Sequence, residues 1–128
     1  MGGLQKACLA GSLAFWAGPL AAASELRQAF LVCAGRLSAL EQHQWLMQED
    51  GADRTGALRD AVLDLVAALP GDPTGDMSLR IAAKQAHAML LRRSVFNGDP
   101  RDAARAARLA GERVSVCRSH VLAGGSGA

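Results

Sequence analysis

The side chains best suited to chemistry in this chain are three cysteines and three histidines, and their spacing fits no common catalytic or metal-binding pattern. His43, His87 and His120 are far apart, and the chain contains no HxxxH, ExxH or CxxC pair. Protein metal sites usually take two ligands from such a short pair. No serine stands in the G-x-S-x-G context of a nucleophile. We therefore expect no metal, no cofactor and no catalytic residue, and we do not expect an enzyme.

The segment CRSH at residues 117–120 contains a cysteine followed by a histidine, as the haem-attachment motif C-x-x-C-H does. Here the second cysteine is missing, and His120 stands in its place. We interpret the segment as the polar end of a helix that carries a disulfide cysteine. Because a helical bundle can hold a ligand between its helices, a small-molecule- or haem-binding bundle is our alternative function.

Residues 1–23 have the pattern of a secretory signal peptide. Lys6 is the only charge before an apolar stretch at residues 7–22, which Gly11, Gly18 and Pro19 interrupt. The three alanines at 21–23 are the small residues that signal peptidase accepts, so we expect cleavage after Ala23. The competing interpretation is a membrane anchor, but a spanning helix needs about 20 apolar residues. We predict a periplasmic or secreted protein.

Cleavage at that position would change the cysteine count from odd to even. Cys8 would leave with the signal peptide, and Cys33 and Cys117 would remain. In an oxidising compartment two cysteines are expected to pair. The alternative is two unpaired buried thiols, which are common in protein cores. We predict a Cys33–Cys117 disulfide.

Hydrophobic periodicity predicts four helices, at residues 25–49, 56–69, 78–96 and 100–122. Ser24 is the expected N-cap of the first helix, and Asp53 or Thr55 that of the second. The fourth begins at Asp99-Pro100, where a capping carboxylate precedes a proline whose missing N–H is harmless. The cluster of turn residues at 70–76 predicts a loop.

These elements predict an all-α fold, a small antiparallel four-helix bundle with up-down-up-down order, because short connections favour antiparallel neighbours. In that order the first and last helices are adjacent, so the disulfide would link them. The predicted domain covers residues 24–122, and the glycine-rich residues 123–128 are expected to form a flexible tail.

The helix at 78–96 carries two apolar stripes. The stripe expected to face the core consists of Leu79, Ala82, Ala83, Ala86, Met89 and Leu90. A second stripe on nearly the opposite side repeats every seven residues and consists of Ile81, Ala88 and Val95, with Leu91 beside them. On the first helix, Leu31 and Trp45 would extend this second surface. We predict that it binds a partner; the alternative is a wide core stripe with scattered surface apolar residues.

Arginines form a second candidate surface. Arg101, Arg105 and Arg108 share one face of the last helix, so they could meet an acidic partner or anionic lipid headgroups. The alternative is an ordinary solvated face. The formal net charge of +2 is low for a general nucleic-acid binder, and we expect no nucleic-acid partner.

Taken together, the sequence predicts an exported helical protein that acts by binding rather than catalysis. An accessory subunit, a chaperone-like factor and an inhibitor all fit this description. The expected partner is another protein or a second copy of the chain, and a membrane surface is possible but not favoured.

Overall fold

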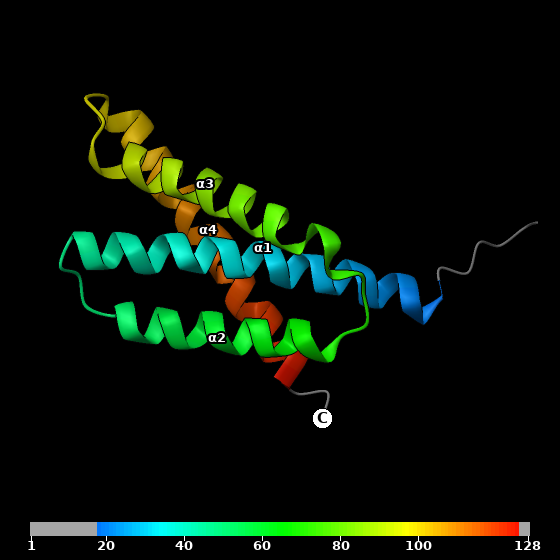
Figure 1. Ribbon diagram of the computed structural model, residues 1–128. Helices are drawn as coiled ribbons and strands as arrows, with labels where there is room; N and C mark the ends of the chain where they lie inside the picture. The colour runs from blue at the N-terminus through cyan, green and yellow to red at the C-terminus, as the bar shows by residue number, and fades with distance from the viewer. Residues whose placement is uncertain (1–17, 126–128) are drawn as a thin grey trace, which may run out of the picture.

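The computed structural model describes residues 18–125, and nearly all of these residues are helical. The elements are α1 (Pro19–Leu46), α2 (Ala52–Ala68), the short 3₁₀ helix η1 (Pro73–Gly75), α3 (Asp76–Val95) and α4 (Pro100–Gly125). The described part contains no strand, and consecutive α-helices run in opposite directions (Figure 1). The predicted all-α antiparallel four-helix bundle is confirmed.

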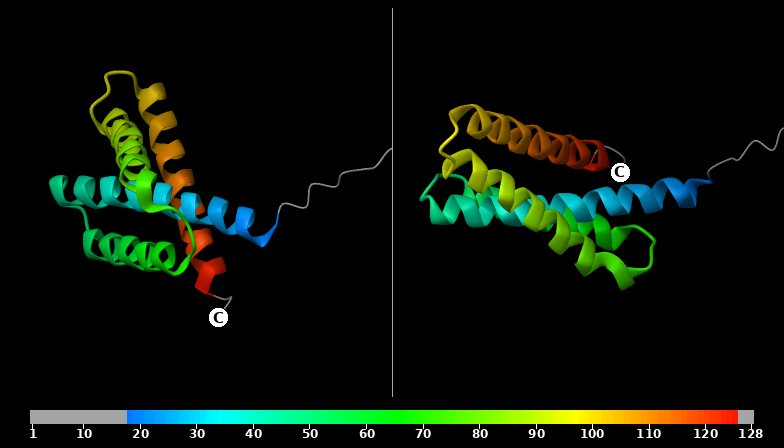
Figure 2. Two further views of the ribbon diagram at one scale, coloured as in Figure 1. Left: turned by 45° about the vertical axis from the view of Figure 1, so that its right-hand side comes forward. Right: turned by 90° about the horizontal axis from the view of Figure 1, so that it is seen from above.

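α1 lies in the middle of the molecule and packs against each of the other three α-helices. Figures 1 and 2 show α2 and α3 on different sides of α1, and α4 crossing α1 obliquely. Within residues 18–125, the backbones of α2 and α3 do not come close to each other. Because α1 is surrounded, its buried positions are not confined to one seam. Leu31, which we expected on an exposed flank, is only 2% exposed.

The core has two parts, and residues of α1 and α4 contribute to both. The larger joins α1, α2 and α4 and consists of Phe30, Leu31, Cys33, Ala34, Leu37, Val62, Val66, Val114 and Cys117. The smaller joins α1, α3 and α4 and consists of Ala39, Leu90, Leu91, Ala106 and Ala110. The alanines of the smaller cluster allow these three helices to approach closely.

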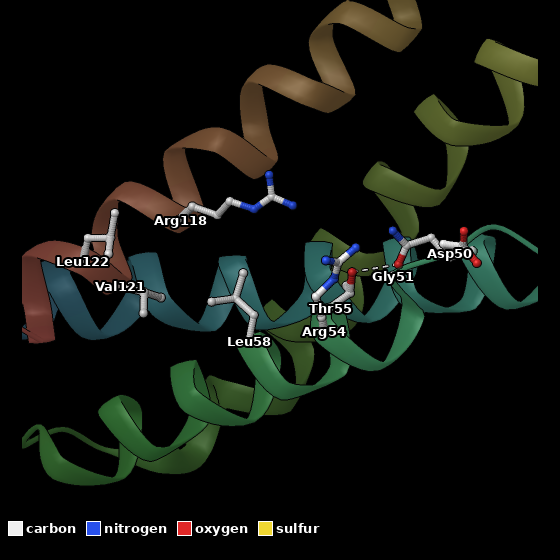
Figure 3. A pocket seen from close by; sticks show the side chains of 9 residues that line it. Asp50, Gly51, Arg54, Thr55, Leu58, Arg118, Val121 and Leu122 are labelled. Carbon is white, nitrogen blue, oxygen red and sulfur yellow. Dashed lines mark hydrogen bonds between the residues drawn. The ribbon is translucent and has the colours of Figure 1, made fainter.

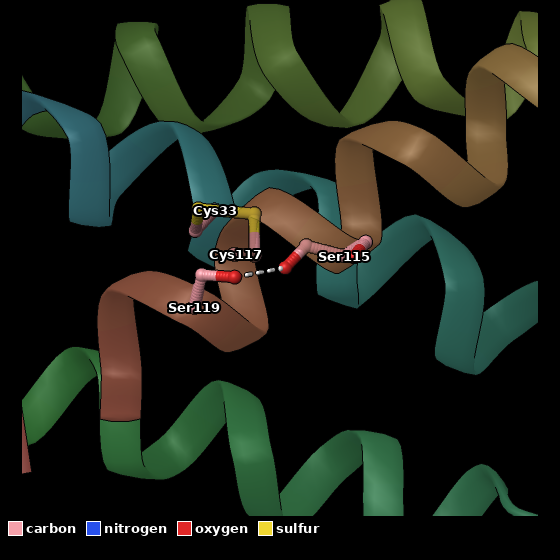
Figure 4. The surroundings of a disulfide bond; sticks show 4 residues. All are labelled: Cys33, Ser115, Cys117 and Ser119. Atoms are coloured by element: carbon pink, nitrogen blue, oxygen red, sulfur yellow. Dashed lines mark hydrogen bonds between the residues drawn. A yellow bond between two sulfur atoms is a disulfide. The ribbon is translucent and has the colours of Figure 1, made fainter. Parts of the chain in front are cut away.

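The disulfide between Cys33 and Cys117 lies at the crossing of α1 and α4, as predicted (Figure 4). The two Cα atoms are 5.4 Å apart, and the bond closes a loop of 84 positions. A loop of that length stabilises the folded state by about 4.5 kcal/mol on the chain-entropy model. That is a large share of the ~5–15 kcal/mol that typically holds a domain of this size together.

α1 and α3 are closest at Gly35. A Cβ atom at this position would lie 2.3 Å from the carbonyl oxygen of Arg80 and 2.9 Å from the Cβ of Ala83. The first distance is far below van der Waals contact, so only glycine fits there without moving one of the helices. Gly35 therefore sets the spacing between the two helices that pack most extensively.

Ion pairs fix the relative positions of the helices. Arg27 on α1 donates two hydrogen bonds to the carboxylate of Asp76 at the start of α3, the first with a distance of 2.6 Å between Nη1 and Oδ1. The hydrogen bond from Arg27 lowers the pKa of Asp76. Arg59 on α2 donates a single hydrogen bond from Nη1 to Oε2 of Glu41 on α1. These contacts hold α2 and α3 to the central helix.

Several predicted helix ends are wrong by a few residues. α1 begins at Pro19 rather than residue 25, because good helix formers continue upstream, and Ser24 lies inside the helix rather than at its N-cap. Gly51, with φ of 103°, precedes α2 in place of the expected Asp53 or Thr55 cap. Thr55 is buried instead, and its hydroxyl donates to Oε1 of Gln44 at 2.7 Å.

The start of α4 is as predicted, because the carboxylate of Asp99 accepts a hydrogen bond from the Arg101 N–H at 3.0 Å. Its end is not, since the helix continues to Gly125 and includes the first part of the expected flexible tail. A Cβ on Gly124 would lie 3.4 Å from Leu65 and Phe30, so the chain still packs on the core there. Residues 126–128 lie outside the described residues.

No helix within the described range is long and apolar enough to cross a membrane. Most of the expected signal peptide, residues 1–17, lies outside that range. Of the described part, Gly18 is the N-cap of α1 and residues 19–23 belong to the start of that helix.

Candidate functional site

The second apolar stripe predicted on α3 does not form one exposed surface. Ile81 and Val95 are exposed, as is Trp45 on α1. Ala88 is half-buried and packs against the smaller core cluster. Leu91 is only 8% exposed and belongs to that cluster, because Ala106 and Ala110 of α4 pack beside it. Leu91 is therefore a core residue and is not part of an exposed strip.

The exposed apolar side of α3 instead includes residues that we expected in the core, namely Ala82, Ala86 and Met89. We call it the α3 outer face; it consists of Met77, Ile81, Ala82, Ala86, Met89 and Phe96. Met89 is 63% exposed and Phe96 is 74% exposed. Phe96 directly follows the last residue of α3, and large exposed apolar side chains near one another are typical of contact surfaces.

A groove adjoins the C-terminal end of this face. It lies between the ends of α1 and α3, has a volume of about 350 Å³, and is lined by Ala39, Gln42, His43, Leu46, Met47, Ala88, Leu91, Arg92 and Phe96. Leu46 and Phe96 stand exposed at its edges, while Leu91 is buried at its base. We call it the α1–α3 groove. It is apolar apart from His43, Gln42 and Arg92.

Charge is distributed unevenly between the two halves of the molecule. Residues 76–125, which form α3 and α4, contain nine Lys and Arg but only four Asp and Glu. Residues 19–75 contain four Lys and Arg and eight Asp and Glu. Arg101, Arg105 and Arg108 are exposed on α4, as predicted. The groove thus opens beside a basic half, and Arg92 forms no ion pair with any residue in the described range.

A separate pocket lies where α4 approaches α2 across the end of α1. Its volume is about 520 Å³, and it is lined by Gln44, Asp50, Gly51, Arg54, Thr55, Leu58, Arg118, Val121 and Leu122. Figure 3 shows Arg54 of α2 and Arg118 of α4 extending toward the same space, beside apolar Leu58 and Val121. Sequence analysis missed this pocket, because it depends on the oblique path of α4.

The three histidines do not converge. His43 Nε2 lies 3.8 Å from Glu49 Oε1, and His120 packs edge-on against the Phe30 ring. His87 is a buried residue of α3 that feels the charges of Arg36 and His43 on α1 and of Arg113 on α4. Within the part of the chain that the structure describes, no three His, Cys, Asp or Glu side chains are grouped so that they could hold a metal ion.

Fold and surface together define a disulfide-linked antiparallel four-helix bundle with an apolar groove beside a basic half. Comparison with protein-family models, with curated proteins and with solved structures finds no match for this chain. Any functional conclusion therefore depends on the geometry and chemistry of the surfaces described above.

Proposed function

We propose that this protein is an exported accessory protein that binds another protein, and that its partner presents an acidic amphipathic segment to the α3 outer face and the α1–α3 groove. The observation that carries the proposal is the exposure of Met89, Phe96 and Leu46 beside a concave apolar surface. Leaving such large side chains in water is unfavourable, and burying them would stabilise a complex.

Shape and charge both favour this kind of partner. A groove between two helix ends suits the apolar side of a partner helix, whose anchors recur every three or four residues. The unpaired Arg92 at the groove and the excess of arginine on α3 and α4 favour acidic groups around those anchors. The groove and the α3 outer face thus supply apolar contact area for such a partner, and Arg92 supplies a positive charge beside it.

Export is supported by the disulfide and by the burial pattern at the start of α1. A disulfide is compatible with an oxidising compartment. The first buried side chain of α1 is that of Phe30, so cleavage after Ala23 would remove nothing from the core. The proposed mature protein begins at Ser24 and is periplasmic or secreted.

The binding surface is tested with two matched helical peptides that have the same leucine positions and carry either glutamate or lysine between them. We expect the glutamate peptide to bind and the lysine peptide to bind at least tenfold more weakly. Phe96→Asp should weaken binding by about thirtyfold, the loss typical of a central anchor. Val116→Asp is the matched control, because Val116 is similarly exposed on α4 outside the groove.

Equal binding of both peptides, or equal losses in Phe96→Asp and Val116→Asp, would contradict the proposal. Partner capture from the exported fraction of the producing cell then identifies the natural partner, and only proteins retained by the wild type and Val116→Asp but lost with Phe96→Asp count. A second copy of the chain as the retained species would show a homodimer instead.

The pocket between α2 and α4 favours a second candidate function, the binding of a small amphipathic anion. Its volume lies within the ~300–1,000 Å³ typical of ligand sites. Arg54 and Arg118 could hold a carboxylate while Leu58 and Val121 contact an apolar chain. Native mass spectrometry with dodecanoate tests this function; binding that Arg118→Gln does not weaken would exclude it. A Soret band in the purified protein would instead favour the haem version.

A further inference from the structure

The disulfide brings two arginines together from opposite ends of the domain. Arg36 lies three residues after Cys33 on α1, and Arg113 lies four residues before Cys117 on α4. Each arginine is therefore one helical turn from its cysteine and on the same face as it. Because α1 and α4 cross with roughly antiparallel chain directions (Figure 1), the turn after Cys33 and the turn before Cys117 lie on the same side of the disulfide.

Arg36 and Arg113 are both half-buried, and their positive charges repel each other. Burial lowers the pKa of Arg36, and the charge of Arg113 lowers it further. Neither arginine forms a hydrogen bond or an ion pair with any residue between 18 and 125. Two unpaired, partly desolvated cations at one helix junction are unfavourable unless an anion joins them.

His87 of α3 faces the same junction. Its side chain is 1% exposed, and both ring nitrogens are buried without a hydrogen-bond partner among the described groups. Desolvation, followed by the charges of Arg36, Arg113 and His43, lowers its pKa to about 4. A buried imidazole with neither nitrogen satisfied is rare in proteins, so His87 presents an unused hydrogen-bonding group to this junction.

No carboxylate from the three helices is available to complete this cluster. Four of the five acidic residues on these helices are each paired with another arginine, in the pairs Glu41–Arg59, Asp76–Arg27, Asp102–Arg93 and Glu112–Arg108. Glu25 is the other acidic residue on α1, and it lies more than two turns before Cys33, on the far side of the crossing. The charge of the junction is therefore not balanced within the described part of the molecule.

We propose that Arg36, His87 and Arg113 bind a small tetrahedral oxyanion of the phosphate or sulfate class at the junction of α1, α3 and α4. The half-exposed guanidinium groups reach the anion from solvent and donate paired N–H groups to its oxygens. A ring nitrogen of His87 donates a further hydrogen bond from beneath. This site is distinct from the α1–α3 groove and from the pocket that contains Arg118.

The test measures thermal unfolding of the disulfide-intact protein at pH 7 and constant ionic strength, with millimolar inorganic phosphate replacing chloride. Phosphate also stabilises proteins by a general effect on solvent, so variants separate the two causes. The wild type, Arg105→Gln and Arg118→Gln should all show a saturable rise in Tm with phosphate. Arg36→Gln and Arg113→Gln should lose it.

Two further measurements keep the outcome clear. In chloride alone, Arg113→Gln should unfold at the same temperature as the wild type or higher, because it removes the repulsion between Arg113 and Arg36. Loss of the phosphate effect in this variant would therefore not reflect misfolding. In wild-type protein, the NMR titration of the His87 ring should move from about 4 to a higher pKa when phosphate is present. An equal phosphate effect in all variants, loss of the effect only in Arg118→Gln, or a His87 titration that phosphate does not change would overturn the proposal.

Discussion

Replacing Gly35 by alanine tests the packing on which the whole bundle depends. The added Cβ would lie 2.3 Å from the Arg80 carbonyl oxygen and 2.9 Å from the backbone nitrogen of Lys84. Both of these are main-chain atoms of α3, so no side-chain rotation can relieve the contact. α1 and α3 would have to separate along the interface where they pack most closely.

Two opposing effects decide the size of the change. Overpacking of a tight core typically lowers the free energy of unfolding by 1–3 kcal/mol, and a clash with backbone atoms is expected to lower it by about 3 kcal/mol or more. Alanine in place of glycine within a helix raises the free energy of unfolding by about 1 kcal/mol, because alanine has the higher helix propensity. We therefore expect Gly35→Ala to lower the free energy of unfolding by about 2 kcal/mol.

Gly111→Ala is the matched control. Gly111 also lies inside a helix, but its added Cβ would meet nothing within 4 Å. This variant should gain about 1 kcal/mol, since only the helix propensity changes. Urea unfolding followed by circular dichroism measures both variants, and we expect them to differ by about 3 kcal/mol. If Gly35→Ala is as stable as Gly111→Ala, α1 and α3 do not make a close backbone contact at Gly35.

Three other outcomes follow from the fold. Replacing Cys33 and Cys117 together by alanine should lower the free energy of unfolding by up to about 4.5 kcal/mol, measured by urea unfolding against the oxidised wild type. As the pH falls from 6.5 to about 4, the free energy of unfolding should fall by up to about 3 kcal/mol, because His87 takes up a proton in the unfolded chain but not in the folded one. His87→Gln should flatten this part of the stability–pH profile. An unchanged slope would refute the assignment of this pH dependence to His87. A chain that begins at Ser24 should have the same Tm as one that begins at residue 18, within about 2 °C by calorimetry.

The elements of this fold can be predicted from sequence because their signals are local. Asp99-Pro100 marks the start of α4 at the correct residue, and the cysteines sit on the buried sides of their helices. Antiparallel order then makes the first and last helices adjacent, so the two cysteines that remain after the expected cleavage can pair. These features depend on neighbouring residues and on connectivity, both of which the sequence contains.

The orientation of α3 could not be predicted in the same way. Alanine occurs on several sides of this helix and distinguishes the core side from the outer side only weakly. Met89 was expected inside and Leu91 outside, and the structure reverses both. Which side of α3 is buried depends on the central position of α1 and on the packing of α4 over Leu91. Both are features of the tertiary structure and leave no signal in the local sequence.

The candidate sites needed the structure for a similar reason. Arg36 and Arg113 are far apart in the sequence, and only the crossing at the disulfide brings them near His87. The groove depends on Phe96 and Leu46, which end two helices and carry no motif. Sequence analysis did identify Ile81 and Val95 as exposed apolar residues, because they break the expected core pattern of α3.

The uneven charge of the two halves gives the molecule an electric dipole that its net charge of +2 conceals. In the electric field of an anionic surface the protein would rotate until α3 and α4 face that surface, even where the net electrostatic attraction is weak. The same property should let it be retained by both cation- and anion-exchange resins at low ionic strength. Its orientation on approach would thus be set at a distance, before any side chain makes contact.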